Sequence, residues 1–121
     1  MPYADTDFVL ALAKPSDWLK ARAEKVHAQY AGELYTSTAT LVELLLYAKN
    51  EGVDPEALVA SGCALFNEVV PITTEHVLKA AHFVSSGGLG VFDALHAACA
   101  EGEIISSDHA YERVGLRVIK I

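Results

Sequence analysis

The chain has 121 residues, enough for one proper hydrophobic core, and we expect a single domain over residues 1–121. A hydrophobic content of 52% and a charged content of 21% exclude an intrinsically disordered chain. The net charge of −7 argues against sequence-blind adhesion to nucleic acid, which usually depends on a basic surface.

The predicted elements alternate between strands and helices from the N-terminus onward. A short strand over Pro2–Asp5 precedes a short helix over Asp7–Ala13, which stops before Pro15. Ser16 is expected to cap the next helix, Asp17–Tyr30. Its core face carries apolar residues at helical spacing, namely Leu19, Ala23, Val26 and Tyr30. A neighbouring stripe carries Trp18, Arg22, Lys25 and Gln29.

The middle of the chain continues the alternation. After a brief strand at Leu34–Thr36, a strongly apolar helix begins at Ser37 or Thr38, runs to about Asn50 and is closed by Gly52. The following elements are a helix from Asp54-Pro55 to near Phe66, a strand at Val69–Ile72, and a helix from Thr73 or Thr74 to about Ser85.

The last third completes the pattern. The expected elements are a loop at Ser85–Gly90, a helix at Val91–Glu101 ended by Gly102, a strand at Ile104–Ser106, a short helix at His109–Val114 and a strand at Arg117–Ile119. Strands that alternate with helices predict an α/β fold, a three-layer α/β/α sandwich with a mainly parallel central sheet. Ligand sites in such sheets lie beyond the carboxyl ends of the strands.

The cysteines and the hydropathy pattern indicate a cytoplasmic location. Cys63 and Cys99 are far apart and match neither a disulfide framework nor a zinc site, which fits a reducing compartment. No apolar run approaches the length of a membrane span, so we expect no membrane association. The N-terminus also lacks the basic and apolar regions of a secretion signal.

Four acidic residues lie where a carboxylate is least expected. Asp5 ends an apolar strand, Glu43 interrupts an apolar helix, Asp93 opens an apolar helix, and Asp108 follows the Ile104–Ser106 strand. A buried carboxylate is costly unless it is paired, hydrogen-bonded or bound to a cation. No Lys or Arg lies within four residues of the three aspartates. A hard cation such as Mg²⁺ or Mn²⁺, which prefers oxygen ligands, would satisfy all four together.

Each acid also has a purely structural explanation. Asp5 and Asp108 precede short helices and could serve only as N-caps. Asp93 suits the dipole of a first helical turn. Glu43 is harder to explain in this way, because apolar residues flank it on nearly all sides. Four such acids, on elements that can converge, make four independent structural roles the weaker explanation.

Four segments in order resemble the motifs of PIN-domain nucleases. Residues 3–12 resemble the opening motif, in which an apolar strand is followed by Asp-Thr and a helical apolar run. Residues 36–45, which contain Glu43, are similar to the second motif, and residues 93–98 to the third. Residues 105–111 resemble the fourth, with Ser106 where Thr is usual and Tyr111 where Phe is usual. The small size resembles the VapC-type toxins of prokaryotic toxin–antitoxin pairs.

The resemblance implies metal-dependent hydrolysis of RNA phosphodiester bonds. It implies that Asp5, Asp93 and Asp108 hold one or two Mg²⁺ or Mn²⁺ ions and that Glu43 completes the pocket, by binding the ion or by orienting a water molecule. Thr6 and Ser106 are expected to hold the carboxylates, with ordinary turn hydroxyls as the alternative. The implied partners are an RNA substrate, a small antitoxin protein and a second copy of the chain in a homodimer.

Two other functions remain open at this stage. One is a PIN-fold RNA-processing or binding factor with little cleavage of its own. The other is a haloacid-dehalogenase-like phosphatase, because residues 5–9 also match the opening motif of that family, with Asp5 as the nucleophile. No later motif of that family is evident, and the chain is short for it.

Two smaller expectations concern residues outside the four acids. His96 lies three residues after Asp93, and we expect it to pack or cap locally rather than to bind a metal. Trp18, Arg22 and Lys25 have two interpretations: they could contact RNA or a partner, or Trp18 could be partly buried with the two cations beside it on the surface. The second interpretation is favoured.

Overall fold

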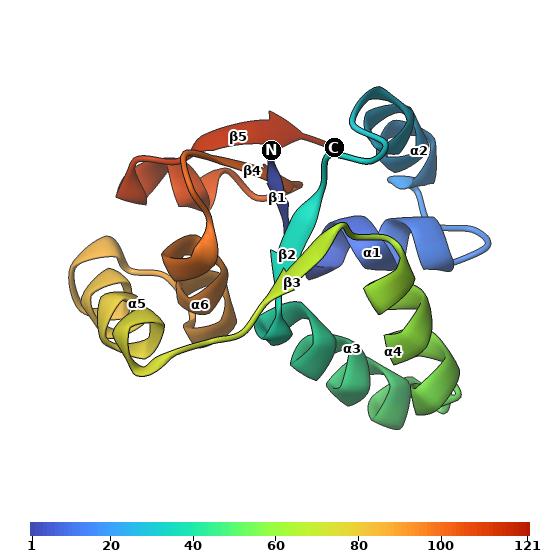
Figure 1. The fold of residues 1–121 in the computed structure, drawn as a ribbon, viewed down its shortest axis with the longest axis horizontal. Coiled ribbons are helices and arrows are strands. Elements are labelled where there is room, and N and C mark those ends of the chain that lie inside the picture. Colours follow the sequence, from blue (N-terminus) through green and yellow to red (C-terminus); the bar gives the residue numbers. More distant parts are fainter.

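A five-stranded parallel sheet lies at the centre of the molecule (Figure 1). The computed structural model describes residues 1–121. The strands are β1 (Tyr3–Ala4), β2 (Tyr35–Ser37), β3 (Glu68–Val70), β4 (Glu103–Ser106) and β5 (Arg117–Lys120). Their order is β3-β2-β1-β4-β5, and every neighbouring pair is parallel. The two-residue strand β1 therefore occupies the middle of the sheet, between β2 and β4.

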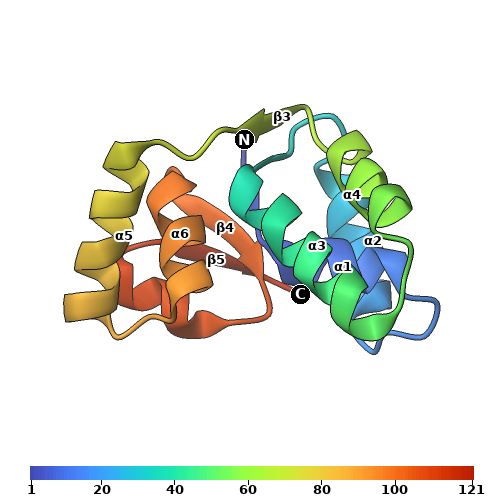
Figure 2. The ribbon, with the colours of Figure 1, turned by 90° about the horizontal axis from the view of Figure 1, so that it is seen from below.

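Helices cover both sides of this sheet. They are α1 (Thr6–Ala13), α2 (Lys20–Gln29), α3 (Thr38–Glu51), α4 (Pro55–Ala64), α5 (Thr74–Gly87), α6 (Val91–Cys99) and the 3₁₀ helix η1 (His109–Val114). Figures 1 and 2 show α5 and α6 on one side, and α1 with α3 and α4 on the other. The predicted three-layer α/β/α architecture is confirmed.

Alternation along the strands divides the apolar side chains between two cores. Tyr3 and Ile104 point to the side of α5 and α6, whereas their neighbours Ala4 and Ile105 point to the side of α1 and α2. All four side chains are fully buried. Because both faces of the sheet are covered, β1 and the middle of β4 are continuously apolar, as buried parallel strands usually are.

Polar residues gather where the central strands end. Asp5 directly follows β1 and caps α1, Ser37 ends β2 and caps α3, and Asp108 follows β4 and caps η1. Since parallel strands end at the same edge of the sheet, these caps all lie at the carboxyl edge, where a ligand site was expected.

The largest difference from expectation concerns the start of α2. The helix begins at Lys20, not at Asp17, because Asp17 forms a turn of its own: its carboxylate accepts the N–H of Leu19, and its carbonyl accepts the N–H of Lys20. Trp18 lies in this turn and is 86% exposed, so the expectation of a partly buried tryptophan is wrong. The expected core face of α2 is correct for Leu19, Ala23 and Val26, which are buried.

Other boundaries move by a few residues. Helix α5 continues past Ser85 to Gly87, so the loop is shorter than predicted. Gly88 caps its end with φ of +66°, a left-handed conformation that favours glycine. Helix α6 ends at Cys99. Strand β3 ends at Val70, and the N–H of Ile72 donates to the Thr38 hydroxyl rather than to the sheet. None of the helices has the length and hydrophobicity needed to cross a bilayer.

Candidate active site

Asp5 lies at the centre of the polar group beyond the sheet. One carboxylate oxygen, Oδ1, accepts the N–H of Asp7 at 3.1 Å and so begins α1. The other, Oδ2, accepts from the Ser106 hydroxyl at 2.6 Å and from the Tyr111 hydroxyl at 3.2 Å. Only 4% of Asp5 is exposed. The predicted role of Ser106 as a hydroxyl that holds a carboxylate therefore has a direct geometric basis.

Burial perturbs the acidity of Asp5. Desolvation, reinforced by the charge of the nearby Asp7, raises the pKa of Asp5 to about 7. His96 and the hydrogen bonds from Ser106 and Tyr111 act in the opposite direction but do not cancel the burial effect. A carboxyl group that resists ionisation in this way would be stabilised as a carboxylate by a bound cation.

Asp93 and Asp108 approach Asp5 from other elements. Asp93, in the first turn of α6, has its Oδ1 3.1 Å from the Tyr111 hydroxyl, so Tyr111 contacts the carboxylates of both Asp5 and Asp93. Asp108 caps η1 by accepting the N–H of Ala110 at 2.8 Å, and its own N–H donates to Ser106 Oγ at 3.0 Å. Burial raises the pKa of Asp93, and the negative charge of Asp108 raises it further. The three aspartates therefore form one linked group.

Glu43 reaches the same region from α3. Thr6 donates its hydroxyl to Glu43 Oε1 at 2.6 Å, and His96 Nε2 contacts the same oxygen. Burial would raise the pKa of Glu43, but the hydrogen bonds from His96 and Thr6 outweigh it, so the pKa lies below its ordinary value. Glu43 and Asp5 are thus two nearby carboxyl groups with opposite pKa shifts.

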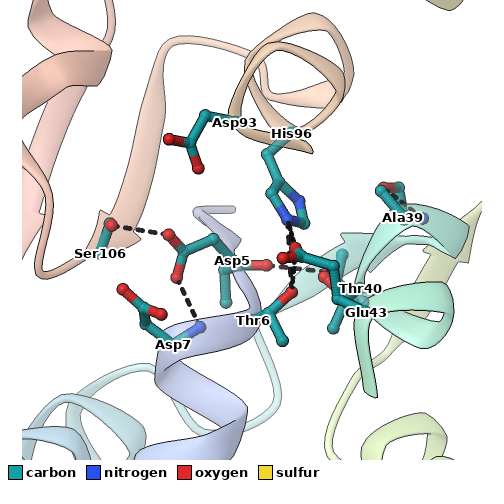
Figure 3. A network of polar contacts seen from close by, with 12 residues as sticks. Asp5, Thr6, Asp7, Ala39, Thr40, Glu43, Asp93, His96 and Ser106 are labelled. Carbon is teal, nitrogen blue, oxygen red and sulfur yellow. Dashed lines mark hydrogen bonds and ion pairs between the residues drawn. The ribbon is translucent and has the colours of Figure 1, made fainter. Parts of the chain in front are cut away.

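The close-up view shows this arrangement (Figure 3). Asp5, Glu43 and Asp93 come from three different elements, and the Asp93 carboxylate is directed toward the side of Asp5. Thr6 connects the two parts of the site, since it follows Asp5 in the chain and donates to Glu43. All four acids singled out from the sequence therefore lie in one polar region.

Two residues of this region were missed at the sequence level. His96 was expected only to pack or cap locally, yet it is 1% exposed and contacts Tyr3, Thr6 and Glu43. Tyr111 was noted only as a replacement for Phe, yet its hydroxyl contacts two aspartates. The available signal was the added polar atom itself: an imidazole on the apolar face of α6, and a hydroxyl where the resembling family has none.

The donor atoms suit a hard divalent cation. Asp93 and Asp108 each use one carboxylate oxygen in a protein hydrogen bond, which leaves the other for a ligand. No Lys or Arg forms an ion pair with Asp5, Asp93 or Asp108. In this conformation, however, no three acidic or histidine side chains are close enough to surround one ion. The residues fit Mg²⁺ or Mn²⁺ in chemistry, while a ready coordination sphere is not formed.

Comparison with known structures reveals close similarity of fold. The chain superposes on VapC20 of Mycobacterium tuberculosis, a Sarcin-Ricin loop cleaving toxin, with a TM-score of 0.83, 18% identity and 100% coverage of both chains. It is also similar to FitAB bound to the IR36 DNA fragment (TM-score 0.80, 18% identity, 99% of this chain and 94% of that one). For FitAcB from Neisseria gonorrhoeae the TM-score is 0.77 and the identity 20%, over 98% of this chain and 96% of that one.

The sequence comparison supplies the family. No curated protein matches the sequence. The model of the PIN domain family, by contrast, matches residues 3–115, a range that contains Asp5, Glu43, Asp93 and Asp108. The solved structures, at such low identities, establish the fold alone, whereas the family model spans nearly the whole chain. This protein belongs to the PIN domain family.

Proposed function

We propose that the protein is a metal-dependent endoribonuclease that hydrolyses RNA phosphodiester bonds and acts as the toxin of a toxin–antitoxin pair. The observation that carries this proposal is the linked group of Asp5, Asp93 and Asp108 at the carboxyl edge of the sheet. Membership of the PIN domain family and the similarity in fold to a cleaving toxin support it. The family match gives no support to a haloacid-dehalogenase-like phosphatase.

In this proposal Asp5, Asp93 and Asp108 would hold one or two divalent cations, Mg²⁺ or Mn²⁺. A cation bound there would neutralise the phosphate charge and polarise the phosphoryl oxygen. The protein's own contribution is to keep the three carboxylates in place: Ser106 and Tyr111 hold Asp5, Tyr111 holds Asp93, and the η1 backbone holds Asp108.

Glu43 has a different role in this mechanism. Its low pKa keeps it ionised, and both of its protein hydrogen bonds go to Oε1. Oε2 can therefore accept a hydrogen bond from a water molecule and orient it toward the phosphorus atom. The water oxygen would form the new bond to phosphorus as the bond to the ester oxygen breaks. Glu43 Oε2 would accept the proton that this water loses, and the leaving oxygen would take up a proton from solvent.

The proposed partners follow from the same features. An antitoxin could cover the acidic group with an arginine, which pairs well with carboxylates. A homodimer would bury apolar side chains that the single chain leaves exposed, such as Leu46 and Leu78. A cytoplasmic location suits the two free cysteines, Cys63 and Cys99.

RNA cleavage tests the proposal. The purified protein is incubated with tRNA, rRNA and short single-stranded RNA in Mg²⁺, Mn²⁺ or EDTA. We expect cleavage with a metal ion, none in EDTA, and none by Asp93→Asn. Asp54→Asn is the matched control, because Asp54 also lies at the start of a helix but is exposed, and its carboxylate accepts hydrogen bonds only from the backbone of its own helix. Equal cleavage by the Asp93 variant would reject the proposed site.

The alternative is a PIN-fold RNA-processing or binding factor with little cleavage of its own. The two possibilities differ in the amount of cleavage by the purified protein and in the partner. A gene for a small antitoxin immediately upstream, whose product inhibits cleavage, favours the toxin.

A further inference from the structure

We infer that His96 is a positioning residue for Glu43 and that Tyr3 holds the His96 ring in place by donating its hydroxyl to Nδ1. The inference rests on the proposed function, since it assigns a supporting role within the same site. It concerns two buried side chains that are otherwise outside the proposed mechanism. With Ser37 they form a chain of hydrogen bonds through the core to Glu43, which we call the relay.

The relay runs from the sheet to the site through hydrogen bonds. The Tyr3 hydroxyl lies 2.7 Å from Ser37 Oγ and 2.6 Å from His96 Nδ1. His96 Nε2, on the other side of the ring, contacts Glu43 Oε1. Tyr3, Ser37 and His96 are each at most 1% exposed. Neither the phenol nor the imidazole can exchange its partner for bulk water, so each donor and acceptor must match its neighbour.

Matching the partners defines the positions of the protons. A carboxylate accepts hydrogen bonds but donates none, so His96 must carry its proton on Nε2 to bond with Glu43. A neutral imidazole then has an acceptor at Nδ1, and the Tyr3 hydroxyl donates to it. The Tyr3 oxygen in turn accepts from Ser37, whose own oxygen accepts the N–H of Ala39 at 3.2 Å. Every group in the relay is satisfied, and no buried side-chain polar atom of the protein lacks a partner.

The relay has a consequence for Glu43. His96 and Thr6 both bond to Oε1, which fixes the carboxylate in one orientation and leaves Oε2 without a protein hydrogen bond. Without the Tyr3 donor, Nδ1 is a buried acceptor with no partner, and the imidazole ring is held on one side only. The ring can then turn, and one of the two anchors of Glu43 is no longer fixed.

A matched pair of tyrosine variants separates this role from general packing. Tyr3 and Tyr35 contact each other edge to face, with ring centroids 5.4 Å apart, and both belong to the same core. The Tyr35 hydroxyl, however, accepts the N–H of Glu101 and has no hydrogen bond to the site. Each Tyr→Phe change removes one buried hydroxyl from this core. We expect Tyr3→Phe to lower kcat about 10- to 100-fold with KM unchanged, and Tyr35→Phe to leave both unchanged.

A double-mutant cycle tests whether Tyr3 acts through Glu43. In a Glu43→Gln background, Tyr3→Phe should cause no further loss of kcat, because the group being positioned is already absent. Independent losses that multiply would overturn the inference, as would equal effects of the Tyr3 and Tyr35 variants while the wild type still cleaves RNA. That last result leaves the proposed function standing.

The tautomer is measured without any RNA. ¹⁵N NMR of the imidazole rings in the labelled full chain should show His96 with a protonated Nε2 and an unprotonated Nδ1. The Nδ1 resonance should shift in Tyr3→Phe, which removes its hydrogen bond, but not in Tyr35→Phe. A protonated Nδ1 in the wild type would overturn the inference. Absence of cleavage by the wild type counts against the proposed function instead, and the NMR result still decides the state of the relay.

Discussion

Asp5 and Glu43 lie in one polar region, yet their surroundings shift their pKa values in opposite directions. Asp5 is held by hydroxyl groups but is almost completely buried beside Asp7, and its pKa rises to about 7. Glu43 is more exposed and accepts bonds from His96 and Thr6, and its pKa falls. Such a separation of pKa values gives the site one carboxyl group that is ionised on its own, Glu43, and one whose ionisation a bound cation would favour, Asp5.

The raised pKa of Asp5 predicts how stability depends on pH without metal. The folded protein holds this proton more tightly than the unfolded chain does, so the stabilising contribution is full below pH 3.8 and is lost as the pH rises through about 7. Asp5→Asn lacks this titration. In EDTA, the free energy of unfolding of the variant relative to the wild type should increase with pH, by on the order of 4 kcal/mol in total.

Urea unfolding of both proteins between pH 4 and pH 8 measures this difference. Asp54→Asn is the control, because its carboxylate is an exposed N-cap, and its difference from the wild type should not rise across this range. A free-energy difference between Asp5→Asn and the wild type that is independent of pH would show that Asp5 ionises normally.

At the level of single residues, the sequence indicates the four acids but not the residues that form hydrogen bonds with them, His96 and Tyr111. Asp5 and Asp108 could be found because each directly follows an apolar strand, and Glu43 because it interrupts an apolar helix. The roles of His96 and Tyr111 could not be found in this way. They depend on how α6 and η1 pack against β1, a contact between residues about 90 or more positions apart that no local pattern encodes.

Helix α2 presents the main cationic surface of an otherwise acidic protein. Arg22 and Lys25 are exposed on one stripe of the helix, and together with Lys120 they line a hollow of about 320 Å³. None of these three side chains forms an ion pair. Lys120 Nζ also contacts the Ser107 carbonyl, and the Ser107 hydroxyl donates to Asp7, so hydrogen bonds connect one wall of the hollow to the residue two positions after Asp5.

Charge reversal on α2 should therefore weaken binding of RNA. In the Asp93→Asn background, which prevents cleavage, we expect Arg22→Glu with Lys25→Glu to lower affinity for single-stranded RNA and to reduce its salt dependence. Fluorescence anisotropy at several salt concentrations measures both. Lys49→Glu with Lys79→Glu is the charge-matched control on α3 and α5. Equal losses from both pairs would mean that α2 has no special role.

The ends of helices were predictable from the sequence where a residue such as glycine marks the end clearly. Gly52 closes α3 in a left-handed conformation, with φ of +69°, as its position after the apolar run indicated. The start of α2 was not predictable from spacing alone. Asp17, Trp18 and Leu19 fit a helical pattern, but the Asp17 side chain competes for the backbone N–H of Leu19 and delays the helix.

Besides Trp18, which is exposed in the turn before α2, the molecule carries apolar surface on two separate flanks. Exposed apolar side chains occur on α3 and on the α5–α6 pair, namely Val42, Leu45, Leu46, Val77, Leu78, Val84 and Val91. A groove between α3 and α4, of about 670 Å³, adds to the first flank. Surface of this kind is typical of proteins that associate.

Self-association is expected from this surface. Light scattering at micromolar concentration should give twice the chain mass of 13.0 kDa. Leu46→Lys and Leu78→Lys, one on each flank, should identify the interface, since only the variant at the interface should become monomeric. A monomeric mass for the wild type, unchanged by added metal, would refute the homodimer.

Binding of Mn²⁺ tests most directly whether the linked aspartates form a metal site. Electron paramagnetic resonance measures free and bound Mn²⁺ in the wild type, in Asp93→Asn and in the control Asp54→Asn. The wild type and the control should bind Mn²⁺ with the same Kd. Asp93→Asn should bind it about tenfold or more weakly, because the substitution removes one of the proposed carboxylate ligands, the one that contacts Tyr111. Equal Mn²⁺ binding by all three proteins would contradict a metal site at Asp5, Asp93 and Asp108.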